Sequence, residues 1–282
     1  MRLRRTSGCI APATGPWQIG EAVAVGTLRG HSPTFTDSNW SPERAAVFDT
    51  RPNLQQQPIG GHLPCLVFDN ALRDPQTLVD MAVSNRSAFV EEARNGFPGL
   101  ALRMPQAFNA LLNDFFLLHV RGPFGVRRIV RSFSRLSMVT RSPVELTPLQ
   151  RVCHRDYLSH DPGQRVFACV LYLFRDAAMG GTSFYRPRRS EQEINDLRDR
   201  WARMSSTEFT QALGMQSAYL TESNDHFERV CTVSAAWNRL IFYDSTIFHS
   251  GDISQPDRMV ADPASGRLTL NGFFVCRPSA GN

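Results

Sequence analysis

The chain has 282 residues, of which 42% are hydrophobic and 10% are aromatic, so it can bury a core and is not globally disordered. Its net charge of +5 comes from dispersed basic residues, which argues against a nucleic-acid partner and suits an anionic small substrate. No run approaches the ~20 apolar residues of a membrane span, and the amino-terminal segment lacks the apolar stretch of a signal peptide. We therefore expect no membrane partner.

The six cysteines form no C-x-x-C pair and have no zinc-ribbon spacing. Several lie in apolar runs, where a buried free thiol is expected. This usage favours a reducing, cytoplasmic setting. The cysteines are Cys9, Cys65, Cys153, Cys169, Cys231 and Cys276.

The first part of the chain predicts an arm, a strand and two helices. Residues 1–62 are rich in Gly, Pro, Ser, Thr and Gln, which predicts an irregular amino-terminal arm. Residues 63–72 read as a strand. Asp74 and Pro75 then begin a helix, as N-cap and first helical residue. A second helix is predicted at 104–122.

From about residue 128 the pattern changes to short, evenly spaced apolar runs, which predict a β-sandwich or a small barrel. A charged stretch at 189–214 predicts a helical insert. We expect one domain over 63–282, with a helical lead-in at 63–127 and a β-core at 128–277. The predicted strands lie within 127–140, 166–174, 182–186, 229–237, 238–244, 245–251 and 266–277.

Three residues of the β-core form a candidate metal site. His154 and Asp156 are two positions apart, so on a strand both side chains share one face. His249 ends a late apolar run, immediately before a Ser-Gly turn. Two histidines and one carboxylate make the facial triad of non-haem Fe(II) oxygenases, which leaves positions open for a co-substrate and O₂.

The last predicted strand carries a candidate anion site. Arg267 and Thr269 lie on the same face of "GRLTLNGFF". An arginine that points into a barrel is costly unless it meets an anion, and its guanidinium binds a carboxylate in a two-pronged way. This pair suits the distal carboxylate of a dicarboxylate such as 2-oxoglutarate.

These motifs together resemble the Fe(II)/2-oxoglutarate-dependent dioxygenase superfamily, in particular a bacterial branch similar to the prolyl-hydroxylase-like oxygenases. The resemblance covers roughly residues 63–277. The motifs that carry it are "HRD" at 154–156, "VLYL" at 170–173, "GGTSFYR" at 180–186, "NRLIFYDSTIFHSG" at 238–251 and "GRLTLNGFF" at 266–274.

The resemblance implies a mainly β fold with flanking helices, the double-stranded β-helix or jelly roll that cupins also adopt. It also implies an enzyme that uses Fe(II), 2-oxoglutarate and O₂. His154, Asp156 and His249 match the catalytic iron ligands, and Arg267 and Thr269 match the residues that bind 2-oxoglutarate. Tyr172 is a further predicted 2-oxoglutarate contact, and Arg258 is the reserve for Arg267 because it lies nearer to His249 in the sequence.

The predicted reaction is hydroxylation of a small molecule such as an amino acid or a natural-product intermediate, with an anionic one favoured. Candidate substrate contacts are Tyr157, Arg186 and Asn271. Two alternatives stay open: a cupin-like metal enzyme that does not use 2-oxoglutarate, and a non-catalytic β-sandwich binding module. An inward-facing Arg267 distinguishes the first alternative, because it has no obvious task there. The sequence makes no prediction of oligomeric state.

Overall fold

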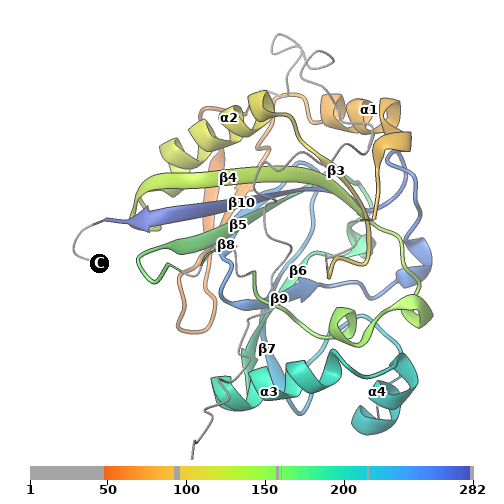
Figure 1. Cartoon of the computed structure of the whole chain (residues 1–282). Helices are drawn as coiled ribbons and strands as arrows, with labels where there is room; N and C mark the ends of the chain where they lie inside the picture. The colour runs from red at the N-terminus through yellow and green to blue at the C-terminus, as the bar shows by residue number, and fades with distance from the viewer. Residues whose placement is uncertain (1–47, 92–95, 157–158, 160, 215, 280–282) are drawn as a thin grey trace, which may run out of the picture.

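The computed structural model describes residues 48–91, 96–156, 159, 161–214 and 216–279. These residues form two antiparallel β-sheets, with helices on opposite sides of the pair (Figure 1). The greater part of the expected arm lies outside the described residues, as does Cys9. No described helix is long and apolar enough to cross a membrane.

The larger sheet has seven strands in the order β1-β2-β8-β5-β10-β4-β3. Its strands are β1 (Asn53–Gln57), β2 (Cys65–Asp69), β3 (Gly99–Arg103), β4 (Val126–Val139), β5 (Arg165–Tyr172), β8 (Leu240–Asp244) and β10 (Leu268–Pro278). β5 lies in the middle of this sheet and is buried along almost its whole length. Burial on both faces explains why its sequence is continuously apolar rather than alternating.

The smaller sheet has three strands in the order β7-β6-β9. They are β6 (Thr182–Pro187), β7 (Phe227–Val233) and β9 (Phe248–Gly251). An isolated antiparallel bridge between His154 and His249 adds the segment around His154 to the free edge of β9.

The path of the chain between the two sheets defines a double-stranded β-helix. From β4 onward the chain visits the larger sheet, the smaller sheet at His154, and the larger sheet again at β5. It then forms β6 and β7 in the smaller sheet and β8 in the larger, and β9 and β10 repeat the alternation. The jelly roll that the sequence predicts is therefore the fold of this chain.

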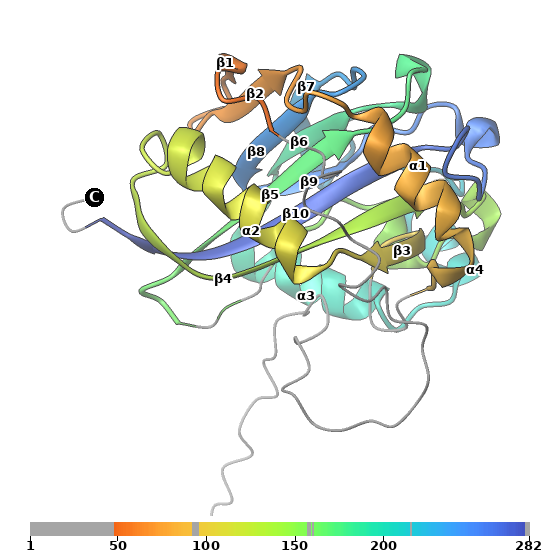
Figure 2. The ribbon, with the colours of Figure 1, turned by 90° about the horizontal axis from the view of Figure 1, so that it is seen from above.

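The helices flank these sheets. α1 and α2 lie across the outer face of the larger sheet, and α3 and α4 lie at the opposite end of the molecule (Figures 1 and 2). The α-helices are α1 (Gln76–Ser84), α2 (Gln106–Phe115), α3 (Glu191–Trp201) and α4 (Ser206–Leu213). Shorter turns are a π-helix at Phe116–Val120 and 3₁₀ helices at Arg86–Ala88, Pro143–Glu145, Pro148–Arg151, Ala177–Met179 and Pro256–Arg258.

Alternation along β10 separates two hydrophobic layers. Leu270 and Phe274 face α2 and belong to the layer between the helices and the larger sheet, where Phe116 stacks on Phe274 at 4.5 Å between ring centroids. Phe273 faces the other way, into the layer between the two sheets. Thr269 has the same parity as Phe273, so the inward face that the sequence predicts is the face toward the smaller sheet.

The structure departs from the predicted elements at β1, at β3 and in the insert. β1 lies inside 1–62, which the sequence predicts to be irregular; it is a strand because its backbone pairs with β2, although all five side chains are exposed. β3 is an unpredicted strand in the helical lead-in and is held by pairing with β4. The insert at 189–214 is two helices rather than one, because Ser205 caps a new helix through the backbone N–H of Glu208.

Candidate metal centre

Two chain segments bring the three predicted metal ligands together. His154 and His249 exchange backbone hydrogen bonds of 2.9 and 2.8 Å, so the segment around His154 runs antiparallel to β9. The N–H of Asp156 donates to the carbonyl of Ser245, 3.0 Å away, which extends the alignment. His154 forms only an isolated bridge rather than the strand expected from sequence.

The side chains of these residues converge. One ligand atom from each of His154, Asp156 and His249 lies within 4.8 Å of the other two. Nε2 of His249 is 3.3 Å from Oδ2 of Asp156, and Nε2 of His154 is 3.8 Å from Oδ1. Side chains 93 positions apart in the sequence (249 − 156) thus form one compact site.

The electrostatic environment holds the ligands in the protonation states that bind metal. Burial by itself raises the pKa of Asp156, but the neighbouring His249 and His154 and the guanidinium of Arg135 lower it overall. The pKa of His154 is also lowered, first by burial and then by the charge of His249. A charged carboxylate and a neutral imidazole result, and metal binding requires both.

The donor atoms fit a divalent transition metal. Oδ1 of Asp156 is buried and has no hydrogen-bond partner among the described residues, which leaves its lone pairs for a cation. Nδ1 of His249 lies 2.9 Å from the carbonyl of Ile247, and this contact places the proton on Nδ1 and the lone pair on Nε2. Two imidazole nitrogens and one carboxylate oxygen are the donor set of a non-haem Fe(II) site.

A cavity of about 440 Å³ opens beside the three ligands, within the size range of small-molecule sites. Its walls come from both sheets and from α3. The lining includes four arginines, two polar residues of β10 and two phenylalanines, which are Arg135, Arg155, Arg198, Arg267, Thr269, Asn271, Phe97 and Phe273.

Arg267 is buried and lines this cavity. Its Nε donates to the carbonyl of Met179 at 3.0 Å, and its Nη2 donates to the carbonyls of Gly180 and Gly181 at 3.1 and 3.0 Å. Burial lowers the pKa of the guanidinium. These carbonyls fix its plane, and no hydrogen bond from Nη1 to a described residue is present. One end of the group is therefore held by the protein and the other is available to a ligand.

Two other predicted pocket residues lie next to each other on β10. Thr269 and Asn271 both line the cavity, and Nδ2 of Asn271 donates to Oγ1 of Thr269 at 3.1 Å. The hydroxyl of Thr269 reaches the carbonyl of Ser137 at 3.4 Å. Tyr172 is fully buried behind the cavity wall, and its hydroxyl bonds to that of Thr182 at 2.8 Å.

The remaining candidates lie elsewhere. Arg186 is on the surface and forms an ion pair of 2.7 Å with Glu228. Arg258 is exposed and is paired with Asp176, so the reserve anchor lies outside the cavity wall. Tyr157 lies outside the described residues.

Arg135 lines the cavity but is not among the site residues predicted from the sequence. Partial alternation in "SFSRLSMV" puts Phe133, Arg135 and Ser137 on one face of a strand, and that pattern was the available signal. Arg198 and Ala202 reach the cavity from the insert, which only the packing of α3 reveals.

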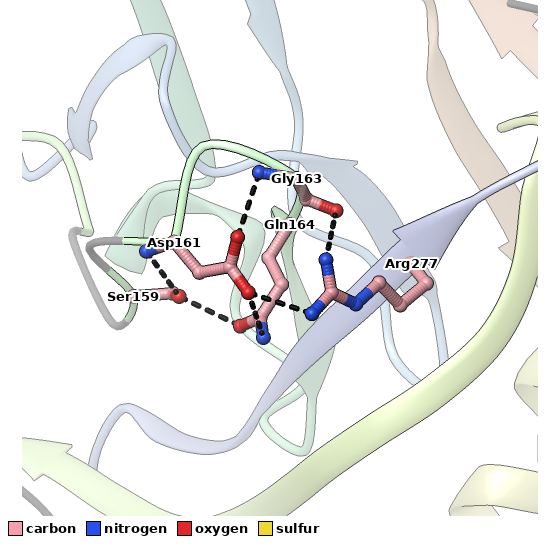
Figure 3. Close-up of polar contacts among 5 residues, drawn as sticks. All are labelled: Ser159, Asp161, Gly163, Gln164 and Arg277. Carbon is pink, nitrogen blue, oxygen red and sulfur yellow. Dashed lines mark hydrogen bonds and ion pairs between the residues drawn. The ribbon is translucent and has the colours of Figure 1, made fainter.

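The loop that follows the metal ligands is attached to β10 by a polar network (Figure 3). Nη2 of Arg277 donates to Oδ2 of Asp161 at 2.7 Å, and Nη1 reaches the carbonyl of Gly163. Asp161 also accepts from Gly163 and Gln164, whose side chain in turn accepts from Ser159. The network fixes the start of β5 relative to the last strand.

Fold and site together define a double-stranded β-helix protein with a two-histidine, one-carboxylate metal centre. The chain belongs to the family described as "Family of unknown function (DUF6445)", whose model matches residues 50–274. No curated protein matches it.

Among solved structures, the chain is similar to several proteins at low sequence identity. SnoN, the non-heme alpha ketoglutarate dependent epimerase from nogalamycin biosynthesis, is 11% identical, with 77% of this chain and 81% of that chain covered and a TM-score of 0.41. A prolyl-4-hydroxylase from Pseudomonas putida is 14% identical, with 82% and 94% covered and a TM-score of 0.36. HygX from Streptomyces hygroscopicus, with nickel and 2-oxoglutarate bound, is 11% identical, with 77% and 83% covered and a TM-score of 0.40.

Proposed function

We propose that this protein is an Fe(II)- and 2-oxoglutarate-dependent oxygenase that hydroxylates a small molecule in the cytoplasm. The observation that carries the proposal is the convergence of His154, Asp156 and His249 on one point, with a buried carboxylate oxygen that has no other described partner. The five cysteines of the described part are unpaired, which suits a reducing compartment.

The residues of the chain divide the work in this proposal. His154, Asp156 and His249 would hold the iron on one face and leave its other positions toward the cavity. Iron and 2-oxoglutarate together supply the activation of O₂ and the oxidising power. Nη1 of Arg267 would bind the distal carboxylate of 2-oxoglutarate, and Thr269 would add a hydroxyl contact. Because other groups hold Nε and Nη2, the contact is one-sided rather than the two-pronged one expected from sequence.

The substrate would occupy the rest of the cavity. Arg198 of α3 and Ala202, which directly follows this helix, line it, which supports the insert as a specificity element. Asn271 lies on the same wall and remains a proposed substrate contact, as does Tyr157. Arg186 would reach a substrate only if its pairing with Glu228 opened.

A binding experiment tests the proposal without knowledge of the substrate. Calorimetric titration of the full chain with Ni(II), and then with 2-oxoglutarate, should show 2-oxoglutarate binding that depends on the metal. Asp156→Ala should abolish Ni(II) binding and 2-oxoglutarate binding, because it removes the carboxylate of the three proposed ligands. Arg267→Gln should keep Ni(II) affinity but weaken 2-oxoglutarate about tenfold or more, as expected for loss of a charged hydrogen bond. Aerobic turnover with Fe(II) should release succinate.

Arg258→Gln is the matched control, because it removes an arginine that is exposed and outside the cavity. It should leave the 2-oxoglutarate affinity unchanged. If Arg267→Gln instead left the 2-oxoglutarate affinity unchanged and Arg258→Gln lowered it, the residue that binds the co-substrate would be Arg258. Metal binding without any 2-oxoglutarate binding would favour a cupin-like enzyme that does not use this co-substrate.

A further inference from the structure

We propose that Arg135 receives an anionic group of the substrate, a carboxylate or a phosphate, at the end of the cavity away from Arg267. This inference rests on the proposed function, since it assigns Arg267 to the co-substrate, and it names the class of molecule that the second half of the cavity binds.

The side chain of Arg135 is buried against aromatic rings in the cavity wall. Arg135 is on β4, only 5% exposed, and it lines the cavity. Its guanidinium carbon is 5.6 Å from the ring centroid of Phe97 and 5.7 Å from that of Phe273. Aromatic rings hold a guanidinium in place and exclude water from its surroundings, which strengthens its attraction for an anion.

The backbone positions of Arg135 and Arg267 are well separated along the strand direction. Arg135 lies directly opposite Asn271 in the β4–β10 register. Arg267 directly precedes β10 and lies four positions before Asn271. Four positions correspond to about 13 Å along an extended chain. The backbone positions that carry the two guanidinium groups are therefore separated by about 13 Å along the strand direction, on the wall of one cavity. A ligand held by Arg267 leaves the other end to a second molecule.

The position of Arg135 relative to the metal site agrees with this arrangement. Arg135 lines the same cavity as the three metal ligands His154, Asp156 and His249. A substrate anchored at Arg135 would therefore occupy the cavity that contains the metal site, as a reacting molecule must.

The charged residues that line the cavity are mostly positive. Its lining residues in the described part include four arginines but a single carboxylate, Asp156, which is a metal ligand. Arg155 is balanced by Glu191 at 2.7 Å, and Nη1 of Arg198 donates to the carbonyl of Cys153 at 2.6 Å. A cavity lined by an excess of one sign concentrates ligands of the opposite sign and disfavours cations. The substrate is therefore expected to be an anion.

Matched small ligands test this inference. Benzoate, phenyl phosphate and the neutral benzamide share a ring that suits the Phe97 and Phe273 walls, and they differ in charge. They are titrated by calorimetry into the full chain saturated with Ni(II) and 2-oxoglutarate. We expect benzoate or phenyl phosphate to bind at least about tenfold more tightly than benzamide. The better of the two anions distinguishes a carboxylate substrate from a phosphate one.

Variants assign the effect to Arg135. Arg135→Gln should abolish the preference for the anion, Arg135→Lys should retain part of it, and neither should change Ni(II) or 2-oxoglutarate affinity more than about threefold. Arg127→Gln is the matched control, because it removes an exposed arginine from the same strand. Thermal unfolding checks that each variant is folded. The lysine variant keeps the test usable if the glutamine variant does not fold.

Three outcomes would overturn the inference: binding of neither anion, equal binding of benzamide, or an unchanged preference in Arg135→Gln. Failure of the proposed function is visible separately, as the absence of 2-oxoglutarate binding in the first titration. In that case the probes are titrated into the Ni(II) protein carrying Arg267→Gln, and dependence on Arg135 is still measured there.

Discussion

At the scale of single residues, the pair formed by Tyr172 and Thr182 shows how the cavity wall is supported. Tyr172 is on β5 of the larger sheet and Thr182 is on β6 of the smaller one, and their hydroxyls lie 2.8 Å apart. Both are buried, and burial raises the pKa of Tyr172 above its usual range. The hydrogen bond therefore connects two neutral groups across the interior and positions Thr182, which lines the cavity.

Tyr172→Phe should lower the free energy of unfolding by about 1 kcal/mol, because the hydroxyl of Thr182 loses its partner in a buried place. Chemical denaturation measures this loss, and Thr182→Val in the same background shows whether the two hydroxyls are coupled. The 2-oxoglutarate titration of Tyr172→Phe tests the co-substrate contact predicted from sequence. A tenfold weaker affinity would support that contact, and an unchanged affinity would contradict it.

At the scale of elements, the turn between β5 and β6 holds Arg267, the residue proposed to bind the co-substrate. The carbonyls of Gly180 and Gly181 accept hydrogen bonds from Arg267. Gly180 has a φ of +86°, and a Cβ added there would overlap the backbone oxygen of Asp252. A Cβ on Gly181 would overlap the backbone oxygen of Val233. Only glycine lets this turn approach the two neighbouring segments closely enough to place its carbonyls against the guanidinium.

Gly180→Ala should therefore destabilise the fold by more than about 1 kcal/mol and also weaken 2-oxoglutarate binding, because the turn must move and Arg267 moves with it. Gly214→Ala is the control: its φ is +61°, but an added Cβ meets no atom within 4 Å. The control should show a cost in unfolding free energy and no change in 2-oxoglutarate affinity. Equal effects of the two substitutions on affinity would contradict this account of the turn.

At the scale of the whole molecule, the metal site joins two distant parts of the chain. His154 and Asp156 precede β5, whereas His249 belongs to β9. A metal ion that binds all three side chains binds the folded state only, since the unfolded chain separates them. Metal binding should therefore stabilise the entire fold by mass action.

Ni(II) at about 100 times its dissociation constant should add about 3 kcal/mol to the free energy of unfolding, which corresponds to a rise of roughly 5–10 °C in Tm. A chelator should reverse the rise, and Asp156→Ala should show none. The stabilisation should decrease as the pH falls, because protons compete with the metal for the imidazole of His154. Because the pKa of His154 is lowered, protonation of this side chain reduces the stabilisation only at a pH below the range in which histidines ordinarily titrate. A metal-independent Tm in scanning calorimetry would contradict the site.

Much of the β-core was predictable because its signals are local. The strands from β4 to β10 are apolar or alternating, and the three ligands are recognisable from the His-x-Asp spacing at 154–156 and from His249 at the end of an apolar run. β1 was not predictable, since its five residues are exposed and carry no hydrophobic pattern. Arg135 was missed because it lies in an arginine-rich segment, where the partial alternation with Phe133 and Ser137 was the one local sign of an inward face.

The amino-acid sequence by itself determined the class of fold and the chemistry of the metal site, because strand periodicity and ligand identity are properties of short segments. Only the tertiary structure decided that Arg135 and Arg198 line the cavity with Arg267, how the Gly180–Gly181 turn restrains Arg267, and that α3 forms part of the wall. These facts depend on contacts between residues far apart in the chain. Strand pairing and helix packing create such contacts, and no local pattern encodes them.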